Sequence, residues 1–276
     1  MRRLTLIAAA LTFACLHAQV VGKQAILVPE SPLTYADTAD LSLGAELVAE
    51  VQILKVIRVD SKKMPTPPGV RRFLVNAKVT ALIRGKQGLA PAISYVTEAK
   101  SDSLGRFPNL KKSRMIVFAV PVANRPTEIQ LIAPDAQQPV TPALGTRVRA
   151  ILAELLGPAP APRILRVGDA FHVPGAIPGE SETQIFLAAD DGRPLSLTVW
   201  REQGQVPRWS VSVGEIVDES AGAPRPDTLL WYRLACFLPQ ALPVASTDSL
   251  DSEAAKFAGE DYATVMRSLG PCPRTR

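Results

Sequence analysis

Apolar and polar residues alternate along residues 72–84, which read RFLVNAKVTALIR. The odd-numbered interior positions are all apolar, and the even-numbered positions carry the polar and charged side chains together with two leucines. A period of two predicts a strand with one buried and one exposed face, not a helix. At about 3.3 Å per residue this strand would run roughly 40 Å, so we expect it to coil or bulge around a small barrel.

Four further strands are expected around this ribbon. Residues 47–59 alternate at first and then lose phase near Leu54, which indicates a bulge. Residues 115–122 form a continuous apolar run that is typical of a central, doubly covered strand. Shorter strands are expected near 93–99 and 128–132. Five strands on one core predict a barrel over residues 45–140, because closure removes exposed sheet edges.

The strand order and the phrase LKKSRMIVFAV, followed by a short EIQLI segment, resemble an OB-type barrel. The resemblance is closest to the netrin-like, TIMP-like variant of secreted proteins, and it covers about residues 45–135. It implies a five-stranded OB-like barrel. The sequence has no counterpart of the N-terminal cysteine through which metalloproteinase inhibitors of that family act, so inhibition is not implied. A shared fold does not supply a function by itself.

A helix over residues 141–156 follows the barrel. Thr141 is placed to cap it, Pro142 suits its first turn, and apolar residues recur at helical spacing. Gly157 ends the helix, and the PAPAP sequence of residues 158–162 predicts a stiff linker. We therefore divide the chain at residues 141–162, with a second unit over 163–276.

The second unit is expected to begin with an antiparallel meander. Strands at 184–189 and 195–200 form a hairpin around an Asp-Gly turn, and a third strand follows at 209–217. Two helices complete the unit, one over 228–238 with Asp227 as its cap and one over about 249–269. The predicted fold class is mainly β with α (α+β): an N-terminal OB-like barrel, then an antiparallel meander with two helices.

The first 18 residues have the pattern of a signal peptide. Two arginines precede an apolar stretch that is too short to span a bilayer, and we expect cleavage near Ala18. The alternative is a lipoprotein anchored at Cys15. Residues 19–44 form a lead-in segment, and no later stretch reaches the roughly 18 uninterrupted apolar residues of a membrane-spanning helix. The sequence therefore predicts a periplasmic or secreted protein.

Cleavage would leave Cys236 and Cys272 as the remaining cysteines. In an oxidising compartment two cysteines most simply form one disulfide, and two buried free thiols are the alternative. Cleavage would also leave His172 as the remaining histidine, which rules out sites that need several histidines. We expect neither a cofactor nor a metal ion.

Charge divides the chain. Residues 55–114 hold 14 Lys and Arg against three Asp and Glu, a net charge of +11, whereas residues 169–276 hold nine against 15, a net charge of −6. Arg72, Lys78 and Arg84 share the even parity of the ribbon and should point to solvent. The remaining members of the predicted basic face lie in or beside loops: Lys62, Lys63, Lys111, Lys112 and Arg114. OB-type barrels often bind polyanions on such surfaces; the alternative is a solvated face, or one that the second unit partly neutralises.

His172 is the candidate general base, but a histidine between Phe171 and Val173 is more typical of a packed structural residue. Trp200 and Trp209 flank one turn. They would form either a platform for a sugar or peptide or an aromatic pair within the meander.

Two acidic groups receive structural interpretations. Asp190 and Asp191 begin like a calcium loop but lack the later ligands, so we interpret them as a hairpin turn. Glu215, Asp218 and Glu219 are close enough in sequence to hold a cation, and we interpret them as a hydrated loop edge.

These features favour an exported, non-enzymatic binding or accessory protein. Its basic face would bind an anionic glycan, lipid A or an acidic protein surface. Nucleic acid is not an expected partner, because the exposed positions of the ribbon offer no aromatic side chains for stacking. Two alternatives remain: a hydrolase with a carboxylate site between the units, and an envelope assembly component in which the basic and acidic units of neighbouring molecules pair.

Overall fold

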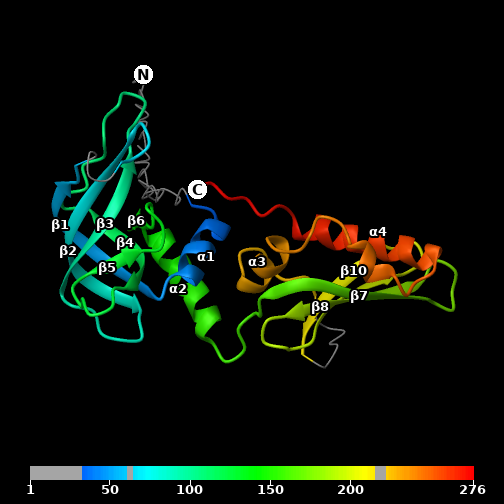
Figure 1. Ribbon diagram of the computed structural model, residues 1–276. Helices are drawn as coiled ribbons and strands as arrows, with labels where there is room; N and C mark the ends of the chain where they lie inside the picture. The colour runs from blue at the N-terminus through cyan, green and yellow to red at the C-terminus, as the bar shows by residue number, and fades with distance from the viewer. Residues whose placement is uncertain (1–32, 61–64, 215–221) are drawn as a thin grey trace, which may run out of the picture.

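The computed structural model describes residues 33–60, 65–214 and 222–276, and these form an α+β protein with mostly antiparallel sheets and four α-helices (Figure 1). The first half contains α1 (Tyr35–Gly44), β1 (Leu47–Arg58), β2 (Val70–Arg84), β3 (Ala92–Lys100), β4 (Arg114–Pro121), β5 (Ile129–Leu131), β6 (Gln137–Pro139) and α2 (Pro142–Leu156). The second half contains β7 (Ile164–Pro174), β8 (Ser181–Ala189), β9 (Leu195–Arg201), β10 (Arg208–Val213), α3 (Leu229–Ala235), the short 3-10 helix η1 (Val244–Thr247) and α4 (Ser252–Leu269). The predicted leader with Cys15 and Ala18 lies outside the described residues, as do Lys62, Lys63, Glu215, Asp218 and Glu219.

β1 and β2 form the long coiled ribbon that the alternating pattern predicts. On β2 the odd positions Val75 and Ala77 are buried, and the odd positions Phe73 and Val79 pack against the same core. The even position Lys78 is exposed. Three register shifts interrupt the pairing of β1 with β2, one of them at Leu54, where the sequence loses its phase. Each inserted residue increases the local twist and so coils the ribbon.

The first sheet has the strand order β3-β2-β1-β4-β5, and β6 also pairs with β4. β3 and β5 are therefore its edges, and the described pairing does not form a closed sheet. One isolated parallel bridge joins Ser94 to Glu128, and the Glu98 amide donates to the carbonyl of Pro134 over 3.0 Å. The closed five-stranded barrel expected from the sequence is thus not shown. β5 has only three residues, too few to pair along the whole edge of β3.

The second sheet is a meander of order β10-β9-β8-β7 in which every neighbouring pair is antiparallel. The Asp-Gly hairpin is present, with Gly192 at a φ of 75°. β7 was not predicted as a separate strand, because register shifts between Ile164 and Ala170 break its period of two. Helices α3 and α4 lie along one face of this sheet (Figure 1).

Capping residues fix the ends of the helices. The hydroxyl of Thr141 accepts from the Leu144 amide, as predicted for α2. α3 begins differently from the prediction: Thr228, not Asp227, caps it and accepts from the Trp231 amide. Asp227 has a φ of 58°, so it belongs to the turn before the helix and cannot cap it.

Helices α1 and α2 contribute to two hydrophobic cores. Leu41 and Val148 lie in the core of the first sheet, whereas Tyr35, Ala39 and Ile151 lie in the core beneath the second sheet. Tyr35 also packs edge-on against Trp231 of α3, with ring centroids 6.0 Å apart. The predicted lead-in segment is therefore helical from Tyr35 onward, and it joins the two halves instead of packing on the first alone.

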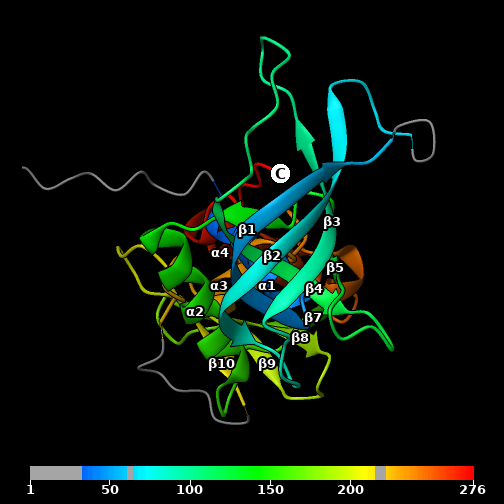
Figure 2. The ribbon, with the colours of Figure 1, turned by 90° about the vertical axis from the view of Figure 1, so that its left-hand side faces the viewer.

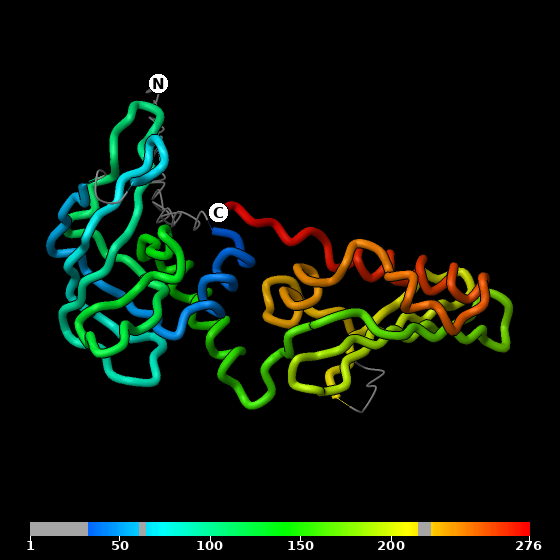
Figure 3. The backbone as a smooth tube through the Cα atoms, viewed as in Figure 1, coloured from blue at the N-terminus to red at the C-terminus, as the bar shows by residue number. Residues whose placement is uncertain are grey.

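The predicted disulfide between Cys236 and Cys272 is present. It links the end of α3 to the chain just after α4, and the last residues then return to α1 (Figure 3). Arg274 donates to Asp40 over 2.8 Å, and Thr275 donates through its amide and its hydroxyl to Asp37.

Across residues 33–60, 65–214 and 222–276, no helix has the combination of length and hydrophobicity that crossing a bilayer requires.

Candidate functional site

A cavity of about 430 Å³ lies where the ends of β1, β2 and β3 project beyond the rest of the first sheet (Figure 2). We call it the distal cavity. Its lining includes Arg58, Thr66, Pro67, Arg71, Arg72 and Phe107.

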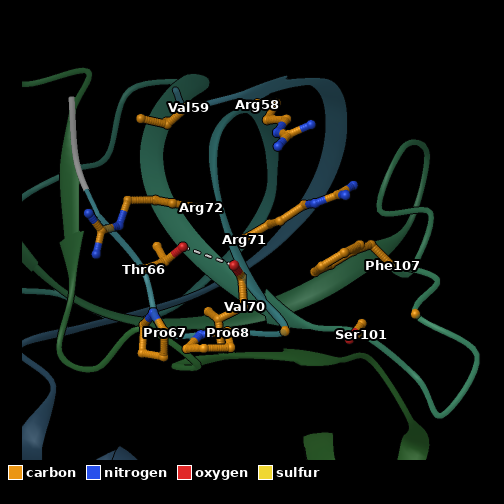
Figure 4. Close-up of a pocket in the computed structure, with 12 residues that line it drawn as sticks. Arg58, Val59, Thr66, Pro67, Pro68, Val70, Arg71, Arg72, Ser101 and Phe107 are labelled. Carbon is orange, nitrogen blue, oxygen red and sulfur yellow. Dashed lines mark hydrogen bonds between the residues drawn. The ribbon is translucent and has the colours of Figure 1, made fainter. Parts of the chain in front are cut away.

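The alternation of β2 explains why an arginine reaches this cavity. The odd-numbered face packs on the core through Phe73, but at Arg71 the ribbon has passed beyond the core and the same face carries a cation. Arg58 pairs with Phe73 across β1 and β2, so it lies on this face as well. Figure 4 shows the side chains of Arg58, Arg71 and Phe107 on one side of the ribbon and Arg72 on the other.

Phe107 positions the arginine. The guanidinium carbon of Arg71 lies 4.0 Å from the centroid of the Phe107 ring, which in turn packs edge-on against Phe73 with centroids 6.5 Å apart. A cation over an aromatic face is attracted by the quadrupole of the ring, and the N–H groups at the edge of the guanidinium stay free to donate. The pair therefore holds a cation in place without neutralising it.

Hydrogen bonds to backbone carbonyls hold the wall of the cavity. The Ser101 amide donates to the carbonyl of Gly69 over 2.8 Å, and the hydroxyl of Thr66 donates to the carbonyl of Val70 over 2.9 Å. Gly69 has a φ of 73°, a conformation that disfavours a residue with a Cβ. The loop that carries Phe107 is closed by Asp102, which accepts from the Arg106 amide and side chain. The hydrogen bond from the Arg106 amide is the main reason that the pKa of Asp102 lies below its ordinary value.

Two cations of the distal cavity lack a counter-ion among the described residues. Arg72 is paired, because its Nε and one terminal nitrogen donate to Glu98 over 2.9 and 2.5 Å. Arg58 and Arg71 are both exposed, and no described carboxylate forms an ion pair with either of them. The cavity thus presents two arginines beside an aromatic ring, and no carboxylate of the described residues forms an ion pair with them.

The predicted basic face is not one surface. Arg72 is paired with Glu98, Arg84 donates to the carbonyl of Ser42 over 2.9 Å, and Arg114 pairs with Glu50 over 3.1 Å. Lys78 is exposed on the opposite side of the ribbon from the core. Lys111 and Lys112 are exposed in the turn before β4. Of the six predicted residues that the structure describes, only Arg72 lines the distal cavity.

Sequence reasoning missed Arg58, Arg71 and Phe107. Arg71 has the odd parity of the buried face, so the alternation predicts that it is buried. It is exposed because the core does not extend to this end of the strand, which the alternation alone does not reveal. Phe107 lies in a loop 34 positions after Phe73, and no local pattern predicts their contact. The available signal was the concentration of positive charge over residues 55–114.

His172 lies in a second polar cluster, on β7 below α4. Its Nδ1 lies 2.8 Å from the hydroxyl of Thr183, and that hydroxyl lies 2.5 Å from Asp261. The hydroxyl has one proton, which it donates to the carboxylate, so Nδ1 of His172 must be the donor to Thr183. Arg201 donates to the other oxygen of Asp261 over 2.7 Å, and the His172 ring stacks on Phe257 with centroids 4.9 Å apart.

This cluster fastens α4 to the second sheet. Thr183 and Asp261 are fully buried, and each of their hydrogen bonds joins a residue of the sheet to a residue of the sheet or of α4. A buried carboxylate needs such partners, because burying an unpaired charge costs several kcal/mol, on the order of the whole stability of a domain. The arrangement agrees with the interpretation of His172 as a packed structural residue.

The other sequence candidates have structural surroundings. Asp191 accepts from the Nε and the amide of Arg193, which makes it part of the hairpin turn. Trp200 pairs with Arg208, and Trp209 with Val199, so the two tryptophans lie on opposite faces of the sheet and form neither a platform nor an aromatic pair.

The junction between the two halves is packed with apolar side chains and paired carboxylates. Glu154 accepts from the Leu229 amide over 2.8 Å, and the hydroxyl of Tyr232 donates to Asp40. Burial, and then this hydrogen bond, raise the pKa of Tyr232 above its ordinary value. The ends of β1, β2 and β3, whose residues line the distal cavity, lie at the far end of the first sheet from this junction (Figures 1 and 2).

In the described part of the chain, no group of three or more His, Cys, Asp and Glu side chains is placed to hold a metal ion. Comparison with known proteins gives no relative: no protein-family model and no curated protein matches the sequence.

Proposed function

We propose that this chain is an exported, non-enzymatic binding protein that takes an anionic group in the distal cavity. The observation that carries the proposal is the pair Arg58 and Arg71, two exposed arginines at one cavity with no described counter-ion. Arginine offers five donors in a planar fork that fits the two oxygens of a carboxylate, sulfate or phosphate. Phe107 adds an apolar surface for the part of the ligand next to the anion.

An OB-like barrel for residues 45–140 is part of the same proposal. Its support is the strand order of the first sheet together with the hydrogen bonds between β3 and the segment around β5. Such barrels are often partly open and bind anionic polymers on their surface. Export rests on the pattern of the first 18 residues and agrees with the disulfide, because disulfides persist in oxidising compartments.

A non-enzymatic role is supported by the state of His172. Its Nδ1 proton is donated to Thr183 and its ring is stacked on Phe257, so the residue is held by packing in a structural cluster. The carboxylates at the junction, Asp40 and Glu154, each hold a hydrogen bond that fastens one half to the other.

The test is binding of labelled anionic probes, a heparin-derived oligosaccharide and poly-glutamate, measured by fluorescence polarisation at low salt. The double variant Arg58→Gln/Arg71→Gln should bind at least about tenfold more weakly. This factor corresponds to a loss of about 1.4 kcal/mol of binding free energy, which is the size expected when charge-assisted hydrogen bonds are lost. Affinity of the wild type should fall as salt rises, because exposed charges are screened.

The matched control is Arg166→Gln/Arg225→Gln, which removes two exposed arginines from the second half. It changes the net charge by the same amount and should leave binding within about twofold of the wild type at physiological salt, where charges more than about 8 Å from the probe are screened. Equal losses in the two double variants would mean that only the overall charge matters, and the cavity would then not be the site.

A further inference from the structure

The free edge of β1 lies directly beside the distal cavity. β4 pairs with β1 only from Leu47 to Gln52, and the backbone of Ile53 then bonds to Ser113 and Lys112 in the turn before β4. β1 itself continues to Arg58, paired with β2 on its other side. Within the described chain, residues 54–58 have no backbone hydrogen bond on the side where β4 would continue. We call this side of residues 54–58 the open edge.

The alternation of an antiparallel pair identifies the free backbone groups. The Val59 amide donates to the carbonyl of Arg72, so residue 59 directs its backbone polar groups at β2. Every second residue does the same, which assigns Ile57 and Lys55 to β2 and leaves Val56 and Arg58 directed outward. The bulge at Leu54 accounts for the change of phase from Ile53, whose groups are also directed outward. The open edge therefore offers the N–H and C=O groups of Val56 and Arg58.

Side chains along the open edge combine apolar surface with positive charge. Leu54 is 51% exposed and Ile57 is 39% exposed, although both are large apolar residues. Lys55 and Arg58 are exposed beside them, and Lys111 and Lys112 mark the end of the edge nearest β4. Among the described residues, none of these four cations forms an ion pair with a carboxylate.

We propose that the open edge of β1 receives an extended acidic segment of a partner protein as an additional strand. The inference rests on the proposed function and names the class of its ligand. An exposed strand edge is complementary to another backbone, because both present N–H and C=O groups at the same spacing. Arg58 and Arg71 would then pair with acidic side chains on one face of the added strand, and Lys55 on the other face.

Charge argues against the other occupants. A second copy of this chain that paired through the same edge would place Lys55 and Arg58 opposite the same cations, and like charges opposite each other destabilise a strand pair. A glycan or a lipid phosphate would satisfy the guanidinium groups but would leave the backbone groups of Val56 and Arg58 without a regular partner. An acidic polypeptide satisfies both sets of groups.

The experiment compares three probes on the full chain by fluorescence polarisation. The first is an acetylated eight-residue peptide of alternating Glu and Val. The second is the same peptide N-methylated at its four central residues, which removes donors on both of its edges. The third is a heparin-derived tetrasaccharide. The unmodified peptide should bind at least about tenfold more tightly than the N-methylated one, because a strand contact depends on backbone donors.

Hydrogen exchange supplies a second readout. The amides of Val56 and Arg58 should become protected when the unmodified peptide binds, and the amide of Ile57 should change little, because it already bonds to β2. Equal affinity for the two peptides, or no protection of Val56 and Arg58, would overturn strand addition. If the tetrasaccharide still bound through Arg58 and Arg71, the proposed function would stand while this inference failed. Binding of none of the three probes would overturn both.

The variant Val56→Pro tests the edge from the side of the protein. It removes an N–H that does not bond to β2, and proline is tolerated on edge strands at such positions. Val56→Pro should abolish the difference in affinity between the unmodified and the N-methylated peptide. The double variant Arg58→Gln/Arg71→Gln should instead weaken the binding of both peptides. If the folded Val56→Pro protein kept the full difference in affinity, the proposal would be overturned. If sedimentation velocity showed that the wild type is a dimer and that Val56→Pro is a monomer, the edge would be assigned to a second copy of the chain instead. Should Val56→Pro fail to fold, the comparison of the two peptides on the wild type decides the matter.

Discussion

The guanidinium of Arg71 lies over the ring of Phe107, 4.0 Å from its centroid, at the far end of the longest ribbon of the molecule. The two residues come from β2 and from the loop between β3 and β4. This contact turns a strand end into a candidate binding site, because it fixes a charge that no described carboxylate neutralises.

Replacing Phe107 with leucine should weaken binding of an anionic probe about two- to fivefold. Leucine keeps the apolar contact with Phe73 but removes the attraction between the ring and the cation, worth about 0.5–1 kcal/mol at an exposed site. The measurement is a polarisation titration with poly-glutamate. Phe171→Leu is the control, because Phe171 likewise packs edge-on against an aromatic residue, Phe186, but lies in the second half of the chain. Unchanged affinity in Phe107→Leu would remove the ring from the site.

Replacing Asp261 with asparagine should lower the free energy of unfolding by about 3 kcal/mol. The buried carboxylate holds Arg201 and the hydroxyl of Thr183, and breaking a buried ion pair leaves the remaining charge uncompensated. Urea denaturation followed by circular dichroism measures the loss. Glu260→Gln is the control. The exposed Glu260 carboxylate lies 3.4 Å from the Arg201 guanidinium, so this variant should lower the free energy of unfolding by less than about 1 kcal/mol. Similar losses in both variants would contradict the role given to the buried cluster.

Removing residues 274–276 should lower the free energy of unfolding by about 2 kcal/mol at pH 7, since Thr275 donates to the Asp37 carboxylate. Burial alone would raise the pKa of Asp37, but the hydrogen bonds from Thr275 and Thr34 outweigh it and hold that pKa below its ordinary value. A carboxyl group whose pKa is lowered by folding stabilises the fold when the pH is above the pKa of an ordinary aspartate, about 3.9. This contribution to stability disappears as the pH falls through the lowered pKa of the folded state. The effect of the deletion should therefore shrink between pH 7 and pH 2.5.

The measurement for this deletion is urea denaturation at the two pH values. Asp37→Asn in the full chain is the matched variant, and it should flatten the pH dependence in the same way. A deletion that costs the same free energy at both pH values would show that the Asp37 carboxylate does not hold the tail.

Replacing both Cys236 and Cys272 with serine should lower the free energy of unfolding by about 2–4 kcal/mol. The bond closes a loop between residues 36 positions apart, and its loss frees the unfolded chain. Wild-type protein treated with dithiothreitol should unfold at the same urea concentration as the double variant. A wild type that dithiothreitol leaves unchanged, although its thiols then react, would show that the bond adds no stability.

Local patterns predicted the elements that have a strong period or a clear boundary. β2, α2 and α4 lie close to where the sequence places them, because alternation, capping and terminal glycines act within a few residues. β7 and β6 were missed for the opposite reason. Register shifts break the period of β7, and β6 has only three residues. The cap of α3 was misplaced by one residue, because the left-handed φ of Asp227 depends on the turn before it.

The candidate site was predicted only as an excess of positive charge. Arg72, Arg84 and Arg114 were expected to share a free face, but each has a partner that is remote in the sequence: Glu98, Ser42 and Glu50 respectively. Pairing across such distances is decided by how the sheet coils and by which helix packs beside it, and neither is encoded in a local window.

The sequence by itself determined the α+β class, the inward parity of the long ribbon, the pairing of Cys236 with Cys272 and the separation of charge along the chain. Tertiary structure decided which of those charges stay free. The alternation along a strand determines which face a side chain lies on, but the fold of the whole chain determines whether a carboxylate lies close enough to pair with it. Arg58 and Arg71 form the candidate site because they lie on the ribbon beyond the last core residues, and no described carboxylate pairs with them.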